Sequence, residues 1–136
     1  MSSATSWWRP SSFARRCAAE STTETGAKHP FAELRNQTIR PYSNLLLHDM
    51  GPGLADTLDE SRATASMWRT APLWGLGSLK YAQGSEQKAR YLHDGRARTL
   101  MEAILWHGGE AAASRGKFEA LSKEERAGVL AFLNSL

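Results

Sequence analysis

The chain has 136 residues, of which 41% are hydrophobic, so it is long enough for one domain with an ordinary core. Lysine and arginine number 17 and aspartate and glutamate 14, and the resulting net charge of +3 is spread along the chain. This weak, interspersed charge argues against nucleic-acid binding and would suit an acidic redox partner. No run approaches the ~20 apolar residues of a membrane span. Cys17 is the only cysteine, which excludes an internal disulfide.

The first part of the chain differs in composition from the rest. Residues 1–28 are rich in serine, threonine, alanine and arginine and have no helical or strand periodicity, which predicts a disordered tail. The first twenty residues also lack the continuous apolar centre of a secretory signal. A single domain is expected over residues 29–136. Its expected class is all-α, with helices joined by long loops.

The first half of this domain shows only short elements. Pro30 favours a short helix that runs to Arg35. Residues 42–50 then form an apolar run that closes on polar groups, and the Gly-Pro-Gly sequence of residues 51–53 stops it. Residues 54–90 are rich in loop signals, with room for one helical turn within residues 78–90.

Two helices near the end carry clear start signals. Thr99 and Glu102 form a Thr-x-x-Glu capping box, and Gly108 is expected to end the helix that they begin. Ser122 and Glu125 form a second capping box at the start of the final helix. The expected buried stripe of that final helix is Val129, Leu130, Phe132, Leu133 and Leu136.

The four histidines are the main candidates for metal chemistry. His29, His48, His93 and His107 are too far apart for a local two-histidine metal motif. His107 has the best position, because it lies at a predicted helix end and two glycines follow it. Those glycines could permit the close approach of a flat, metal-bearing cofactor. A helix-capping histidine with a glycine stop explains the same pattern without any metal.

Several blocks in order resemble the C-terminal haem domain of the bacterial di-haem thiol-oxidoreductase-like family, which is related to the di-haem cytochrome c peroxidases. The blocks are residues 29–31, 36–43, 45–51, 69–77 and 92–97, and an ending at 121–136 that is similar to the last helix of a c-type cytochrome. The resemblance implies a cytochrome c-like helical domain that binds haem c. Such a domain would exchange electrons with a redox partner protein or a second haem domain.

The resemblance also implies which residues hold the cofactor. His107, before Gly108, matches the place of an axial ligand in the related peroxidases, so it is the expected iron ligand, with Met50 or His48 as second choice. Arginine beside the pocket would pair with the haem propionates. The expected cofactor contacts are Cys17, Trp68, Trp74, His93, Arg96 and Trp106. No catalytic residue is assigned.

The haem-attachment site departs from the family pattern. Residues 17–21 read Cys-Ala-Ala-Glu-Ser where the family has Cys-x-x-Cys-His, so Glu20 and Ser21 replace the second cysteine and the histidine. The expectation is therefore a truncated or degenerate C-terminal half, and whether the chain is an enzyme stays open. The resemblance implies a periplasmic location. The alternatives are a haem-free helical remnant that acts as an interaction module and, more remotely, a zinc enzyme built from the scattered histidines.

Overall fold

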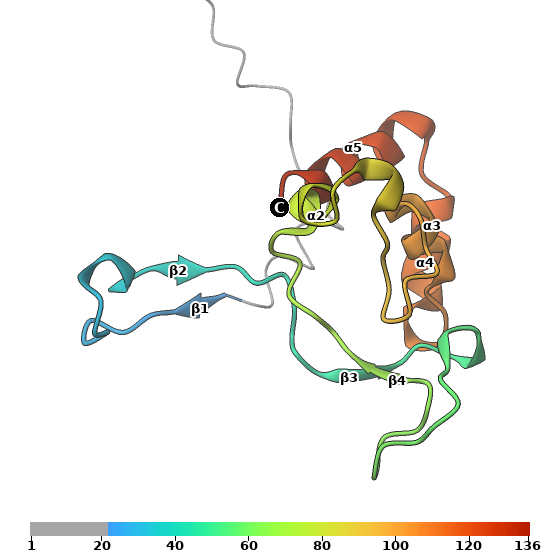
Figure 1. Ribbon diagram of the computed structural model, residues 1–136, viewed down its shortest axis with the longest axis horizontal. Helices are drawn as coiled ribbons and strands as arrows, with labels where there is room; N and C mark the ends of the chain where they lie inside the picture. The colour runs from blue at the N-terminus through green and yellow to red at the C-terminus, as the bar shows by residue number, and fades with distance from the viewer. Residues whose placement is uncertain (1–21) are drawn as a thin grey trace, which may run out of the picture. The chain divides into compact units, whose positions relative to one another are not determined.

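A computed structural model describes residues 22–136 (Figure 1). The chain has two units, Met1–Asn44 and Leu45–Leu136. The described residues form four α-helices and two small antiparallel sheets, and 40% of them are helical. The prediction of an all-α fold was therefore wrong. The physical reason is that two pairs of extended segments, β1 with β2 and β3 with β4, satisfy their backbone groups across the pair instead of within a helix.

The first unit contains a β-hairpin. Strand β1 (Thr23–Glu24) pairs antiparallel with β2 (Thr38–Ile39), and β1 lies within the segment predicted to be a disordered tail. The pairing continues beyond the strands, since the Thr25 amide donates to the Gln37 carbonyl at 3.0 Å. Between the strands, η1 (Ala32–Leu34) is a single 3-10 turn. The predicted short helix in this region is thus reduced to one turn.

The second unit begins with another hairpin. Strand β3 (Leu47–Asp49) pairs antiparallel with β4 (Met67–Arg69), with His48 opposite Trp68. The residues between the strands form a long connection that opens with the 3-10 turn η2 (Pro52–Leu54). A connection of this length gives none of the short-turn signals by which a hairpin is found in a sequence. The sequence therefore did not show that the end of the apolar run at residues 42–50 pairs with Met67–Arg69 as a strand.

Short helical turns follow β4. They are η3 (Leu76–Ser78), α2 (Leu79–Ala82) and η4 (Glu86–Lys88). The single turn of α2 confirms the helical turn predicted within residues 78–90. The end of the chain packs on this region, where Gly75 donates from its amide to the Leu136 carbonyl at 2.9 Å. A Cβ at Gly77 would lie 2.0 Å from the Asn134 carbonyl oxygen, so the turn accepts only glycine there.

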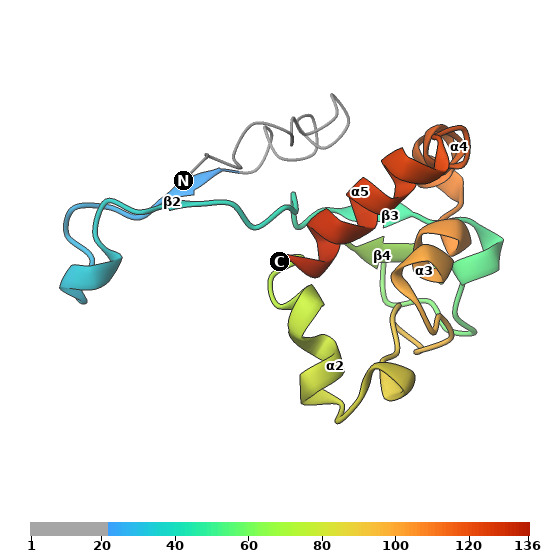
Figure 2. The same ribbon diagram turned by 90° about the horizontal axis from the view of Figure 1, so that it is seen from above.

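Both predicted C-terminal helices are present. They are α3 (Leu100–Trp106) and α5 (Lys123–Asn134), and they lie beside each other (Figure 2). Ser122 and Glu125 form both bonds of the predicted capping box. At α3 the Thr99 hydroxyl accepts from the Glu102 amide at 3.0 Å, but the Glu102 carboxylate accepts from the Arg98 amide instead of the Thr99 amide.

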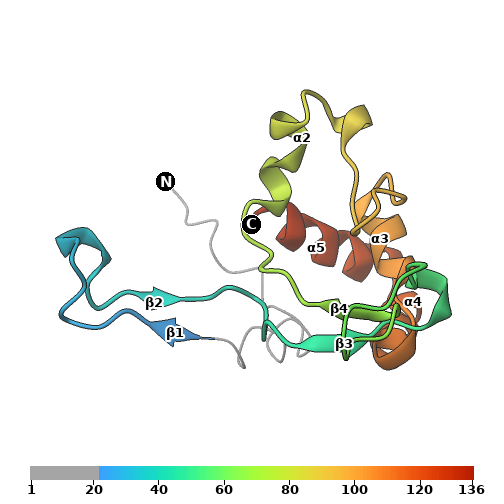
Figure 3. The same ribbon diagram turned by 60° about the horizontal axis from the view of Figure 1, so that its bottom comes forward.

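One helix has no counterpart in the sequence prediction. Helix α4 (Ala112–Glu119) follows the turn η5 (Gly109–Ala111), and this turn contacts β3 (Figure 3). It was missed because Gly116 weakens the helical signal and only Phe118 is buried. The predicted stripe of α5 is half-buried, and no residue of that helix is fully buried. Among the described helices, none is long and apolar enough to cross a membrane.

Candidate functional site

Two of the predicted cofactor residues contact each other. Trp68, in β4, is half-buried, and its indole N–H donates to the Leu54 carbonyl at 2.8 Å. The imidazole of His93 stacks on its ring, with centroids 3.6 Å apart and an angle of 14° between the planes. Parallel stacking at this distance buries one face of each ring. The structure therefore brings Trp68 and His93 together, and each covers a face that a cofactor would otherwise contact.

The turn after His93 is held by its own side chains. The Tyr91 amide donates to the Ala97 carbonyl at 2.9 Å, which closes the turn. The Asp94 carboxylate accepts from the Arg96 amide at 3.1 Å and forms an ion pair with the Arg96 guanidinium. Burial opposes ionisation of Asp94, but the hydrogen bonds and the charge of Arg96 outweigh it and lower the carboxyl pKa. Asp94 thus bonds within its own turn, as aspartate side chains often do.

Arg96 connects this turn to two other elements. Its Nη1 donates to the Gly53 carbonyl in η2, and its guanidinium lies 4.9 Å above the Trp106 ring at the end of α3. A guanidinium over an indole is a favourable cation–π arrangement. Because Nε pairs with Asp94, a haem propionate would compete with protein groups for Arg96. Arg98, two positions further along the chain, is exposed. Its bond to Glu102 comes from the main-chain amide and leaves the guanidinium more accessible to a propionate than that of Arg96.

Trp74 lies elsewhere along the chain. It stands before Gly75, at the entry to η3, and its side chain is 56% exposed. Gly75 has a φ of 77°, which lets the chain turn sharply there. The sequence placed Trp74 with the other tryptophans against a cofactor; in this structure it presents more than half of its surface to solvent.

His107 follows Trp106, the last residue of α3, and its own backbone is extended. It caps the helix, and its amide donates to the Ile104 carbonyl at 3.2 Å. Its ring nitrogen Nδ1 lies 2.7 Å from the Ala103 carbonyl oxygen, and since a carbonyl only accepts, Nδ1 carries the proton. In the neutral imidazole the other nitrogen, Nε2, is then an acceptor. Histidines that bind metals are commonly fixed in this way by a backbone carbonyl.

The two glycines after His107 serve the packing of the chain itself. A Cβ at Gly108 would lie 2.9 Å from the Met50 carbonyl oxygen, and one at Gly109 would lie 2.1 Å from that of Asp49. Gly109 also has a φ of 50°. The space beside these glycines is therefore filled by residues 49–51. This contact with the main chain is a reason for glycine at both positions that needs no cofactor, and the approach of a porphyrin beside them stays a prediction.

The second-choice ligands lie on the segment that meets these glycines. His48 pairs through Nδ1 with the Glu110 carboxylate at 2.8 Å, and the same carboxylate accepts from the Asp49 amide at 3.1 Å. The hydrogen bond from His48, followed by that from Asp49, lowers the pKa of Glu110. Met50 is half-buried, and its main chain contacts Gly108. All three candidate ligands therefore stand on two adjoining stretches of chain.

The core of the second unit is thin for its length. Among the described residues, the large apolar side chains that are buried are Leu54, Leu100 and Phe118, a small set for a domain of this size. The buried apolar residues are Leu54, Ala89, Ala97, Leu100, Ala103 and Phe118. Large apolar side chains left exposed include Leu45, Leu46, Leu47, Leu58, Trp74, Tyr81, Leu105 and Trp106. The second unit thus leaves many large apolar side chains uncovered by its own residues.

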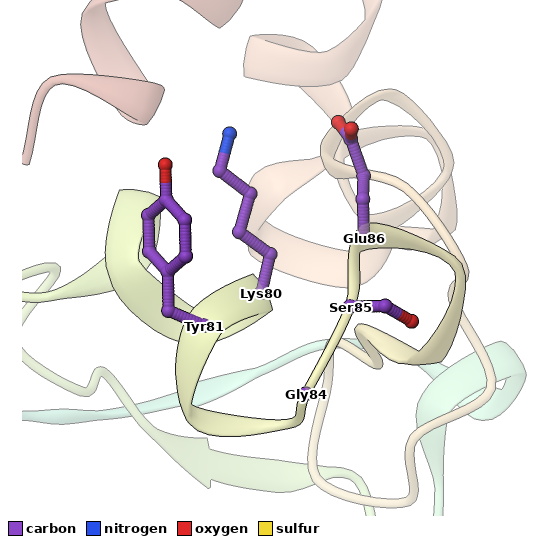
Figure 4. A pocket seen from close by; sticks show the side chains of 5 residues that line it. All are labelled: Lys80, Tyr81, Gly84, Ser85 and Glu86. Carbon is purple, nitrogen blue, oxygen red and sulfur yellow. The ribbon is translucent and has the colours of Figure 1, made fainter.

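A surface pocket lies apart from these residues along the chain. It has a volume of about 440 Å³ and opens between α2 and η4, where Lys80, Tyr81 and Glu86 point to the same side (Figure 4). Its remaining lining residues are Gly84 and Ser85. The pocket contains no histidine, cysteine or methionine. In residues 22–136, no three histidine, cysteine, aspartate or glutamate side chains gather into a metal site.

Comparison with known proteins decides the family. Residues 3–136 match the family described as "Di-haem oxidoreductase, putative peroxidase". The chain belongs to the di-haem oxidoreductase family. The predicted resemblance is thereby confirmed over nearly the whole chain. No curated protein and no solved structure gives a significant match. Cys17, the candidate attachment residue, lies outside the part of the chain that the structure describes.

Sequence reasoning missed two residues that support His107. Glu110 holds β3 as described above, and Arg115 donates from Nη1 to the His107 carbonyl at 3.1 Å. Glu110 follows two glycines, which are typical of a loop. No neighbouring residue therefore indicated that its carboxylate contacts His48 and Asp49 in β3. Arg115 lies in the helix that was not predicted. Both contacts join residues that are distant in sequence or separated by a turn, and such contacts leave no periodic pattern.

Proposed function

We propose that this chain is a haem-binding electron-transfer domain of the di-haem oxidoreductase family, with His107 as an iron ligand. The observation that carries the proposal is the state of the His107 ring. Its Nδ1 proton is committed to the Ala103 carbonyl, so that Nε2 keeps the lone pair that iron requires. Family membership supplies the reason to expect haem at such a histidine.

The other residues would hold the group and shield it. Trp68, His93 and Trp106 would supply aromatic contacts, and Arg96 or Arg98 would pair with the propionates. Cys17 would attach one vinyl group through a thioether. When bound, haem supplies a site for one-electron transfer. The partner that exchanges this electron would be a redox protein or a second haem domain, and with haem c attached the protein would work in the periplasm.

The exposed apolar side chains give independent support. Leu105 and Trp106, next to His107, are 43% and 39% exposed. Burying such surface against a porphyrin would stabilise both partners by roughly 25 cal/mol per Å² of apolar area. A domain that packs around haem needs fewer large side chains in its own core. The thin core of the second unit is what this arrangement produces.

Absorption spectroscopy of matched variants tests the proposal. The chain is produced with cytochrome c maturation machinery and routed to the periplasm, as wild type, His107→Ala and His29→Ala. We expect a Soret band in the wild type that shifts or is lost in His107→Ala. His29→Ala is the control, because His29 lies on the hairpin of the first unit. Identical spectra for all three proteins would contradict His107 as the ligand.

A haem-free interaction module is the second candidate function. The observation that favours it is the sequence of residues 17–21, where Glu20 and Ser21 stand in place of the second cysteine and the histidine of the attachment motif. In this case the exposed apolar side chains would contact another protein. The spectra above separate the two functions, since this one predicts a folded chain without a Soret band.

A further inference from the structure

His107 is held in place by more than its own helix. The Nδ1–Ala103 bond fixes the rotation of the ring, but the bond is only as well placed as the main chain at the last turn of α3. A helix ends with carbonyls that have no partner within the helix, and such ends fray. The chain changes direction directly after His107, at Gly108. A ligand at this position therefore needs contacts from outside the helix to stay fixed.

Arg115 supplies such contacts from the side of α4. Its Nη1 donates to the His107 carbonyl at 3.1 Å and approaches the Leu105 carbonyl at 3.5 Å. Its Nε pairs with Glu119, one turn further along α4, at 3.3 Å. The side chain is 36% exposed, so it is partly removed from solvent. A cation bonded to the last carbonyls of a helix stabilises that end through both hydrogen bonds and the helix dipole.

Glu110 supplies contacts from the side of β3. Its two carboxylate oxygens bind different groups of the strand: Oε1 accepts from the Asp49 amide and Oε2 pairs with Nδ1 of His48. Asp49 and His48 lie 61 and 62 positions before Glu110 in the sequence. Charge-assisted bonds of this kind are stronger than neutral ones. They hold the turn after His107 against the hairpin.

The main chain of Gly108 and Gly109 packs tightly against that of residues 49 and 50. Gly108 and Gly109 touch the carbonyls of residues 49 and 50 so closely that neither position could carry a Cβ without displacement. The chain at His107 and the turn after it therefore contacts β3 and the residues that follow it on one side, and α4 on the other. Loosening either side would let the end of α3 move, and the ring of His107 with it.

We propose that Glu110 and Arg115 are positioning residues that fix His107 for binding haem iron. This inference rests on the proposed function, because it assigns a purpose to the fixed ring. Glu110 acts through the strand and Arg115 through the helix end. Neither residue needs to touch the cofactor. Each is expected to contribute to the orientation of the His107 ring beyond its contribution to folding.

The first test uses the haem-free chain. The ring of His107 is followed by nitrogen-15 NMR, which reports which ring nitrogen carries the proton. In the wild type we expect a single tautomer with the proton on Nδ1. Glu110→Ala, Arg115→Ala and the double variant should show a mixture of tautomers. Glu110→Gln and Arg115→Lys, which keep part of the bonding, should return towards the single tautomer.

The second test uses the chain loaded with haem. The spectra of Glu110→Ala and Arg115→Ala should move towards that of His107→Ala. Glu60→Ala and Arg62→Ala are matched controls on the exposed turn between β3 and β4, and they should keep the wild-type spectrum. Circular dichroism shows whether each variant is folded. If the double variant is unfolded, the two single variants test the inference. A single Nδ1 tautomer retained in both alanine variants would overturn the inference. A wild type that takes up no haem would overturn the proposed function and, with it, the purpose assigned to the fixed ring. The tautomers, which are measured without haem, would still show whether Glu110 and Arg115 fix that ring.

Discussion

The two ends of helix α3 are held in different ways. At the first end, Thr99, Glu102 and Arg98 satisfy one another within five positions of the chain. At the other end, the contacts of His107 and the turn after it reach to residues 49–51 and to Arg115. The first end could be predicted from a short sequence pattern. The second end could not, and it carries the candidate ligand. A functional position can thus depend on contacts that no local pattern reveals.

The largest expected effect tests the second end. Gly109→Ala places a methyl group 2.1 Å from the Asp49 carbonyl oxygen at a position with φ of 50°, so the turn must shift away from the strand. We expect the free energy of unfolding to fall by roughly 3 kcal/mol or more. Chemical denaturation followed by circular dichroism measures it.

The matched control for this change is Gly116→Ala in α4, where a Cβ meets nothing within 4 Å. Alanine favours a helix interior over glycine, so this variant should gain about 0.5–1 kcal/mol. The two glycine variants should therefore have opposite signs. Equal losses in both would mean that the turn at Gly109 is not packed against the strand as described.

A smaller effect is expected from Arg96, which reaches the last residue of α3 from the neighbouring turn. Arg96→Ala removes the bonds to Gly53 and Asp94 and the cation–π contact with Trp106. The loss should be about 2 kcal/mol, since a hydrogen bond from a charged group contributes about 1.5 kcal/mol and a cation–π contact of a partly exposed cation about 0.5–1 kcal/mol. Tryptophan fluorescence should change as well, because the cation leaves the indole. Arg62→Ala, on an exposed turn, should leave both quantities unchanged.

The first end of α3 should respond as an ordinary helix cap. Thr99→Ala leaves the Glu102 amide without its side-chain acceptor and should cost about 1 kcal/mol. Thr99→Ser, which keeps the hydroxyl, is the control and should recover most of the loss. The tautomer of His107 should not change in either variant. If it did change, the two ends of the helix would not be independent.

The smallest effect concerns pH and the turn at residues 91–97. The pKa of Asp94 is lower in the folded chain than its ordinary value of about 3.9, so the unfolded chain binds the proton more readily. Its contribution to stability is present above that ordinary value and is lost as the pH falls through the lower folded pKa. Asp94→Asn should therefore flatten the acid side of the stability profile, measured by denaturation at several pH values. Glu60→Gln, on an exposed turn, should leave the profile as in the wild type.

Local chemistry accounts for what the sequence predicted correctly. The caps at Thr99 and Ser122 and the single turn of α2 each depend on a few neighbouring residues. The family resemblance likewise came from short blocks in order. Within the candidate site, the sequence placed His107 at the end of a helix, and the structure has it as the C-cap of α3.

Distant pairing accounts for what the sequence did not predict. The strands are two or three residues long, and β3 and β4 are joined by a long connection, so neither alternation nor a turn motif marked them. Glycines 108 and 109 suggested space for a cofactor, but their use depends on residues 49–51, which only folding brings there. Helix α4 has a weak apolar face and was not predicted, so the position of Arg115 within it could not be predicted either.

The amount of haem that the chain holds tests the central claim most directly. The chain is produced with cytochrome c maturation machinery, and its pyridine haemochrome spectrum is compared with its protein concentration. We expect stoichiometric haem in the wild type that resists acid-acetone extraction, and extractable haem in Cys17→Ser. A folded wild-type chain without haem would contradict the account, and the exposed apolar residues beside His107 would then be examined as a protein-binding surface.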